Sequence, residues 1–215
     1  FYAAWKKHRL AFQYELNRQE RFLPLALALA GMGLKSLRSR LGSKPGPVYD
    51  QSLAYYSAGV RQRPLSAHYL QNMLAEYFDA PLRVEQFAGA WYEVPETQLT
   101  RLGAGNAVLG STALAGERVW QRDLRMRLWF GPLRRRQFED FLPGGSAAAA
   151  LAKWLKLLAG SSFEYEVRLV LHREDVQGVG LLPAGGGRLG WDAFVATRAS
   201  EQHRSDASYF LHTTA

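Results

Sequence analysis

The chain has 215 residues, of which 47% are hydrophobic and 21% are charged, a balance typical of a folded protein rather than a disordered one. It contains no cysteine, which excludes disulfides, thiolate metal sites and cysteine nucleophiles, and its formal net charge is +8. The longest apolar stretch, residues 23–32, is about half as long as the roughly 20 residues that cross a bilayer as a helix, so we predict no transmembrane span.

The positive charge is concentrated at the start of the chain. Residues 1–63 contain eleven Lys and Arg against three Asp and Glu, whereas residues 64–215 contain sixteen of each kind. This asymmetry indicates a segment that meets an acidic protein surface, a phosphate backbone or an anionic membrane. The alternative is a basic helical face that is simply solvated.

Helical periodicity marks the first part of the chain. Residues 1–16 predict an amphipathic helix whose apolar stripe needs a partner, and a second helix is expected from Phe22 to about Gly31, with Pro24 in its first turn. Asp50 is expected to cap a short helix that ends near Gly59. The stripe of the first helix comprises Phe1, Trp5, His8, Phe12 and Leu16.

A longer helix is predicted before the pattern changes. Ser66 is expected to cap it and Pro81 to stop it. After Pro81 the period becomes alternating, which predicts strands over residues 82–87, 125–130 and 163–171. The apolar face of the helix comprises Leu70, Met73, Leu74, Tyr77 and Phe78.

Two helices are predicted between the second and third strands. A short one carries Phe138 and Phe141, and Ser146 is expected to cap the longer one that follows. The third strand alternates most regularly, with apolar residues such as Tyr165 facing inward and charged residues such as Glu166 facing outward. The apolar stripe of the longer helix comprises Leu151, Trp154, Leu155 and Leu158.

These elements predict an α+β fold, with an N-terminal helical segment followed by two small β-rich modules separated by helices. We place the helical segment at residues 1–80, the first β-rich module at 81–160 and the second at 161–215. A faint internal repeat favours two modules, because residues 82–87 lead to Leu109-Gly110 and Trp120, and residues 163–171 lead to Leu189-Gly190-Trp191. Two such modules would let one molecule bind two copies of a partner.

Glycines stand next to large apolar residues in many predicted loops. Large apolar residues give rigid contact area, while glycine adopts backbone conformations closed to other residues, so these loops are suited to packing rather than acid–base chemistry. In chain order the pieces include Gly89-Ala90-Trp91, Leu102-Gly103, Leu109-Gly110, Gly116-Glu117-Arg118-Val119-Trp120, Gly131-Pro132-Leu133, Phe141-Leu142-Pro143-Gly144-Gly145 and Leu189-Gly190-Trp191. Earlier pieces are residues 1–9, Tyr56-Ser57-Ala58-Gly59-Val60, Pro64-Leu65-Ser66-Ala67, Tyr77-Phe78-Asp79-Ala80-Pro81 and Val84-Glu85-Gln86-Phe87. The order and spacing of all these pieces resemble the TssG family of type VI secretion baseplate proteins, also called ImpH or VasB, over nearly the whole chain.

The resemblance implies a structural protein that is not an enzyme and needs no cofactor. A TssG protein is expected to be a wedge subunit of the baseplate, bundled with TssF (two copies) and connected toward TssE, the sheath and the hub. Two foot regions would each hold a TssK trimer, in the cytoplasm of a Gram-negative bacterium and at the inner-membrane complex. TssG proteins are longer at the N-terminus, so the 215 residues are expected to be part of a longer protein.

Apolar residues on the loops and on the first helix are the expected partner contacts. A tryptophan in a glycine-rich loop either plugs the core of its own domain or inserts into a partner as a hot spot, and Trp120 and Trp191 are the strongest cases. The predicted partner-binding residues are Leu109, Leu114, Trp120, Leu181, Leu182, Leu189, Trp191, Trp5 and Phe12.

No pattern in the sequence favours a catalytic, cofactor or metal site. Residues 185–190 satisfy the glycine spacing of a dinucleotide site, but too little chain follows them for the rest of such a unit. Residues 134–136 are three consecutive arginines, which either bind a phosphate group or form a surface that faces solvent or a partner. His172, near Glu174 and Asp175, is the nearest approach to an acid–base cluster, and we interpret it as a surface group at the end of a strand.

Two other functions stay open. The basic first 63 residues favour a module that binds nucleic acid or an anionic surface. The other alternative is a hydrolase, whose catalytic residues would be those of the cluster around His172. Binding to nucleic acid would weaken steeply as salt rises, whereas a contact made by apolar residues would be much less sensitive to salt.

Overall fold

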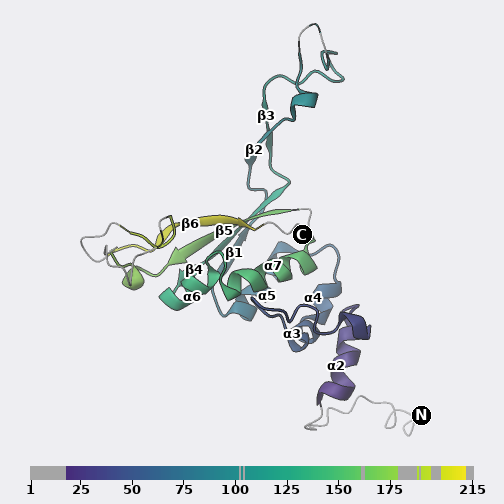
Figure 1. The fold of residues 1–215 in the computed structure, drawn as a ribbon, viewed down its shortest axis with the longest axis vertical. Coiled ribbons are helices and arrows are strands. Elements are labelled where there is room, and N and C mark those ends of the chain that lie inside the picture. Colours follow the sequence, from purple (N-terminus) through teal and green to yellow (C-terminus); the bar gives the residue numbers. More distant parts are fainter. Residues whose placement is uncertain are drawn as a thin grey trace. The chain divides into compact units, whose positions relative to one another are not determined.

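The computed structural model describes residues 18–101, 103, 105–160, 163–178, 188, 190–194 and 200–211. The chain divides into two compact units, one made of residues 1–43 and 48–63 and the other of residues 44–47 and 64–215. The predicted α+β class is confirmed, since helices build the described part of the first unit and helices with two small sheets build the second (Figure 1). The amphipathic helix predicted over residues 1–16 lies outside the described residues.

Short helices form the first unit. Helix α2 (Arg18–Leu29) packs against α3 (Asp50–Tyr55) and α4 (Ser57–Arg61), and the 3-10 helix η1 (Lys35–Leu37) follows α2. Two local predictions were wrong here. α2 begins before the predicted start, so Pro24 lies inside the helix instead of in its first turn. Asp50 is the first residue of α3 rather than its cap, and its carboxylate accepts a hydrogen bond from the backbone N–H of Ser39 at 3.0 Å.

A mixed four-stranded sheet is the centre of the second unit. It comprises β1 (Leu82–Glu85), β4 (Arg125–Leu133), β5 (Glu164–Leu171) and β6 (Arg204–Leu211), in the order β1-β4-β5-β6. The two outer pairs are antiparallel, and the central pair, β4 with β5, is parallel. Parallel neighbours need a crossover connection, which α6 (Arg135–Phe141) and α7 (Ser146–Leu158) provide. β2 (Ala90–Glu93) and β3 (Arg118–Gln121) pair apart from this sheet.

The compact units divide the chain differently from the three predicted segments. The parallel pairing of β4 with β5 joins strands from both predicted β-rich modules in one sheet. Helix α5 (Ala67–Phe78), which we placed in the helical segment, belongs to the larger unit. It packs on β1, and the ring of Phe78 lies 5.1 Å from that of Phe141. Long-range contacts of this kind leave no local pattern in the sequence.

The two central strands of the four-stranded sheet bury most of one face, as the alternation predicted. The buried side chains on the two central strands include Leu128 and Phe130 on β4 and Tyr165 and Val167 on β5. The ring of Phe130 lies 4.5 Å from that of Phe141 on α6. Desolvation on this face raises the pKa of Tyr165 to about 12. The predicted apolar stripe of α7 is buried as well.

Charged side chains cover the opposite face of the sheet and neutralise one another. We expected Glu166 to face water, and only 5% of it is exposed. Arg168 and Arg127 cover its carboxylate, with N–O distances of 2.7 and 3.0 Å, and Arg127 also reaches Glu85 at 3.0 Å. Burial by itself would raise the pKa of Glu166, but the hydrogen bonds from the two arginines outweigh burial and hold this pKa below its usual range.

Ser66 and Ser146, both predicted as helix caps, provide a matched test. The hydroxyl oxygen of Ser66 accepts a hydrogen bond from the backbone N–H of Tyr69 at 3.1 Å, so this cap is confirmed. Ser146 is the first residue of α7, and Gly145 holds the cap position, so that prediction was wrong. We expect Ser66→Ala to lower the free energy of unfolding by about 1 kcal/mol and Ser146→Ala to change it much less, as measured by urea unfolding. Equal losses would contradict the assignment.

Candidate functional site

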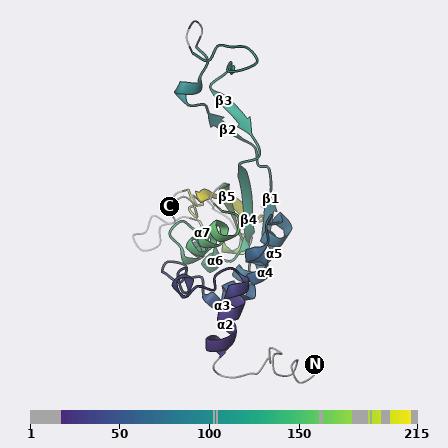
Figure 2. The same cartoon turned by 90° about the vertical axis from the view of Figure 1, so that its right-hand side faces the viewer.

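A two-stranded arm leaves the four-stranded sheet between β1 and β4 (Figures 1 and 2). We call residues 86–124 the arm. Its lower part, the shaft, is the antiparallel pair β2 and β3, in which Trp91 lies opposite Trp120 and Glu93 opposite Arg118. Beyond the shaft, the tip contains the 3-10 helix η2 (Glu96–Gln98). An isolated two-stranded ribbon is only marginally stable in water, so an arm of this kind gains stability from a surface that covers it.

Two exposed tryptophans face each other across the shaft. The ring centroids of Trp91 and Trp120 lie 5.4 Å apart in an edge-to-face arrangement, and 62% and 48% of these residues are exposed. Val94 donates its N–H to the carbonyl of Glu117, and the ladder alternates, so the tryptophans occupy a pair without backbone hydrogen bonds, where side chains approach most closely. The pair is a rigid aromatic surface open to solvent.

Gly89 makes room for this pair, because a Cβ atom at residue 89 would overlap the indole ring of Trp120. We therefore expect Gly89→Ala to displace this indole and to weaken the exciton signal of the tryptophan pair in circular dichroism. Gly105→Ala is the control, since Gly105 lies on the same arm with open space where its Cβ would be. An unchanged spectrum for Gly89→Ala would show that the position of the Trp120 indole does not depend on the space left by Gly89.

The tip of the arm presents apolar side chains on an ordered turn. Of Leu109, 94% is exposed, and Val108 and Leu114 are also exposed. The hydroxyl oxygen of Thr100 accepts a hydrogen bond from the N–H of Leu114 at 2.7 Å, and the carbonyl of Val108 accepts from the N–H groups of three following residues. Apolar side chains held outward by such a turn suit insertion into a partner.

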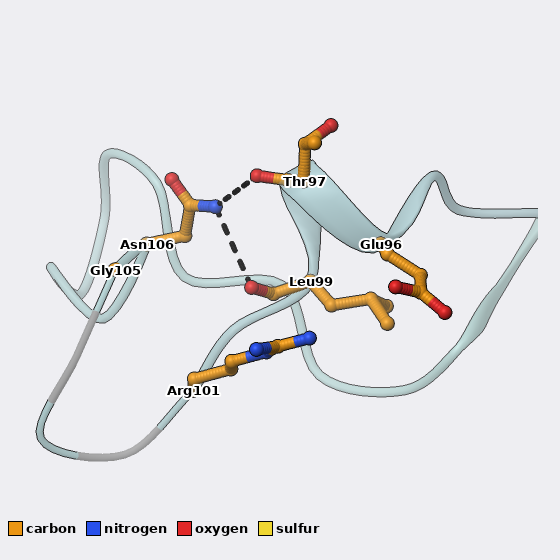
Figure 3. A pocket seen from close by; sticks show the side chains of 6 residues that line it. All are labelled: Glu96, Thr97, Leu99, Arg101, Gly105 and Asn106. Carbon is orange, nitrogen blue, oxygen red and sulfur yellow. Dashed lines mark hydrogen bonds between the residues drawn. The ribbon is translucent and has the colours of Figure 1, made fainter.

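A small hollow lies beside this turn (Figure 3). Its volume is about 270 Å³, and Leu99 lies between the charged side chains of Glu96 and Arg101 in the view shown. The side-chain amide of Asn106 donates to the carbonyl of Thr97 at 2.8 Å and closes one wall. The hollow is smaller than a typical small-molecule site, and its lining of two opposite charges around an apolar residue suits one polar side chain of a partner.

The described members of the predicted partner-binding set fall into three places. Leu109 and Leu114 lie at the tip, whereas Trp120 lies in the shaft with Trp91, so the structure does not bring the three together. Trp120 does not fill the core of its own domain, because its side chain is exposed. Trp191 is half-buried and packs its ring 5.9 Å from that of Tyr209. Leu181, Leu182, Leu189, Trp5 and Phe12 lie outside the described residues.

Sequence reasoning missed two exposed aromatic residues of the arm, Trp91 and Phe87. Trp91 belongs to Gly89-Ala90-Trp91, one of the glycine and apolar pieces, and this membership was the available signal. Phe87 has a positive φ of 58°, which is rare for a bulky residue and cannot be read from the sequence.

His172 directly follows the last residue of β5, as interpreted, and belongs to an ionic cluster at the surface. Arg134 donates to Glu174 at 2.8 Å and approaches Nδ1 of His172 at 3.3 Å. The hydrogen bond from Arg134 holds the pKa of Glu174 below its usual value. Next to Arg134, Arg135 pairs with the buried carboxylate of Asp192 at 2.8 Å. Both arginines therefore neutralise carboxylates of this chain, which argues against a phosphate site here.

The described residues contain neither a metal-binding cluster nor a helix suited to a membrane. No three His, Asp or Glu side chains there are placed to hold a metal ion. No helix in the described ranges has the length and apolar character that crossing a membrane requires.

Comparison with known proteins decides the family. The family profile described as "Type VI secretion, TssG" matches residues 1–196. The chain belongs to the TssG family. The resemblance seen in the sequence is thereby confirmed, and the arm lies within the matched residues. A search of curated proteins found no match.

Two solved structures show the same fold. One, described as the TssK-TssF-TssG baseplate subcomplex of the type VI secretion system, has a chain that matches with a TM-score of 0.70 and 20% identity, over 97% of this chain and 87% of that one. Another, described as the baseplate complex from the type VI secretion system, matches with a TM-score of 0.58 and 18% identity, over 100% of this chain and 60% of that one.

Proposed function

We propose that this TssG-family chain is a structural component of the type VI secretion baseplate wedge, which bundles with TssF and anchors TssK trimers. The observation that carries the proposal is the arm, an ordered projection whose shaft and tip expose tryptophan and leucine side chains. The similar fold in a solved TssK-TssF-TssG subcomplex supports TssF and TssK as the partners. The work of the protein is then recognition and geometry, not catalysis.

The arm is the proposed anchor for one TssK trimer, and the connection between β5 and β6 is the proposed anchor for a second. Arg125 and Glu164 are register partners at the end of the sheet where the arm joins β4. The connection between β5 and β6 starts after Leu171, which is the register partner of Leu133 at the opposite end of β4. Two anchors on one molecule would raise the effective concentration of the second contact once the first has formed.

The helical unit is the proposed contact for TssF. Leu25 and Leu29 lie one turn apart on α2 and are exposed, and the described residues 18–63 contain eight Lys and Arg against two Asp and Glu. An apolar stripe in basic surroundings suits a helical bundle with an acidic partner. We also propose two TssF copies, contacts toward TssE, the sheath and the hub, and a cytoplasmic location at the inner-membrane complex.

Co-purification at two salt concentrations tests the proposal. The chain is expected to capture TssF and TssK, with little loss of TssK at high salt, because the arm contact is apolar. TssE is included, and the stoichiometry of the purified complex measures the copy numbers. Duplex DNA is the competing ligand. Strong, salt-sensitive capture of DNA without TssK or TssF would overturn the proposal in favour of a nucleic-acid binding module.

A further inference from the structure

One side chain of the arm and one of the four-stranded sheet meet at the same carboxylate. Tyr92 of β2 donates its hydroxyl to Oε2 of Glu164 at 2.7 Å. Arg125 donates to the same oxygen at 3.1 Å. Glu164 and Arg125 are the first residues of β5 and β4, so this contact connects the arm to the two central strands of the sheet.

Two aromatic rings flank the arginine of this contact. The guanidinium of Arg125 lies 4.7 Å from the ring centroid of Phe210 on β6 and 5.8 Å from that of Tyr92. Burial and the hydrogen bond to Glu164 raise the pKa of the Tyr92 hydroxyl, which is the donor in this contact. Glu164 of β5 and Arg125 of β4 therefore both contact Tyr92, and Phe210 of β6 packs on Arg125.

This contact determines which face of the shaft is turned away from the sheet. Tyr92 follows Trp91 directly on β2, and successive side chains of a strand point to opposite faces. Because the Tyr92 face is held against Glu164, the face that carries Trp91 and Trp120 is turned away from that residue. Backbone hydrogen bonds from Ala88 to Arg125 and from Glu164 to Leu124 hold the base of the arm, and the Tyr92 contact adds a restraint farther along the shaft.

We propose that Tyr92, Glu164 and Arg125 form a joint that fixes the direction of the arm, and that they are positioning residues for the partner contact farther along it. The second half of this proposal rests on the proposed function. An arm already held in one direction loses less conformational freedom when it binds, so the joint strengthens binding without touching the partner.

The absence of cysteine from the sequence makes a distance measurement direct. Spin labels at Ser111→Cys on the tip and Lys156→Cys on α7 report the distance between arm and body by pulsed electron resonance. We expect a narrow distance distribution in the parent protein and a clearly broader one in Tyr92→Phe and in Glu164→Ala. Glu93→Ala is the matched control, because Glu93 pairs with Arg118 inside the arm and should leave the distribution narrow.

The outcomes separate the joint from the proposed function. A parent distribution as broad as those of the variants would overturn the joint, and so would unchanged widths in both variants. In the unlabelled protein, Tyr92→Phe and Glu164→Ala are expected to bind TssK several-fold more weakly than Glu93→Ala does. Broadening with unchanged TssK affinity would overturn the positioning role. If the parent captures no TssK, the proposed function fails, while the distance distributions still decide the joint.

Discussion

Leu109→Asp combined with Leu114→Asp is expected to abolish TssK capture by the arm and to leave TssF binding intact. Both leucines are exposed at the tip, and burying a charge at a hot spot leaves it without water or a partner. Loss of one hot-spot residue costs about 2 kcal/mol or more, so TssK affinity should fall by roughly 30-fold or more. Titration of TssK by calorimetry measures the loss of affinity. Co-purification of TssF shows whether the variant is still folded and able to bind its other partner.

Ser111→Asp combined with Ala113→Asp is the matched control for this change. It adds the same two charges to the same exposed turn but keeps both leucines. We expect it to reduce TssK affinity much less. Equal loss in the two double variants would mean that charge alone weakens binding. Loss of both TssF and TssK, or of neither, would contradict the assignment of the tip as a TssK contact.

Phe130→Ala is expected to destabilise the larger unit by about 3–5 kcal/mol, because it removes a fully buried ring from the centre of the sheet. Its ring contacts Phe141 on α6 and Phe78 on α5, so the resulting cavity separates the sheet from two helices. For a unit of this size the melting temperature should fall by roughly 10 °C. Thermal and urea unfolding followed by circular dichroism measure the change.

Phe210→Ala deletes the same side chain from the opposite face of the same sheet. Phe210 is 48% exposed and packs beside the guanidinium of Arg125, so its loss should cost about 1 kcal/mol or less. If Phe130→Ala lowered the free energy of unfolding no more than Phe210→Ala does, the packing of the helices on the buried face would not stabilise the unit as proposed.

The sequence alone determined the elements whose signals are local. The alternation at residues 163–171 fixed a strand with one apolar face, and Tyr165, Val167, Leu169 and Leu171 are all buried. Ser66 was recognisable as a cap because the bond that defines it spans three residues. The glycine and apolar pieces of the loops were enough to identify the family, and one of them contains Leu109, a candidate contact.

Only the tertiary structure decided how these elements combine. The parallel pairing of β4 with β5 merged the strands of two expected modules into one sheet, and it brought Glu166 beneath Arg127. The register of the shaft placed Trp120 against Trp91 rather than with the leucines of the tip. Each of these contacts joins residues that lie far apart along the chain. Periodicity and capping act over a few residues, so they carry no record of which distant strand becomes a neighbour.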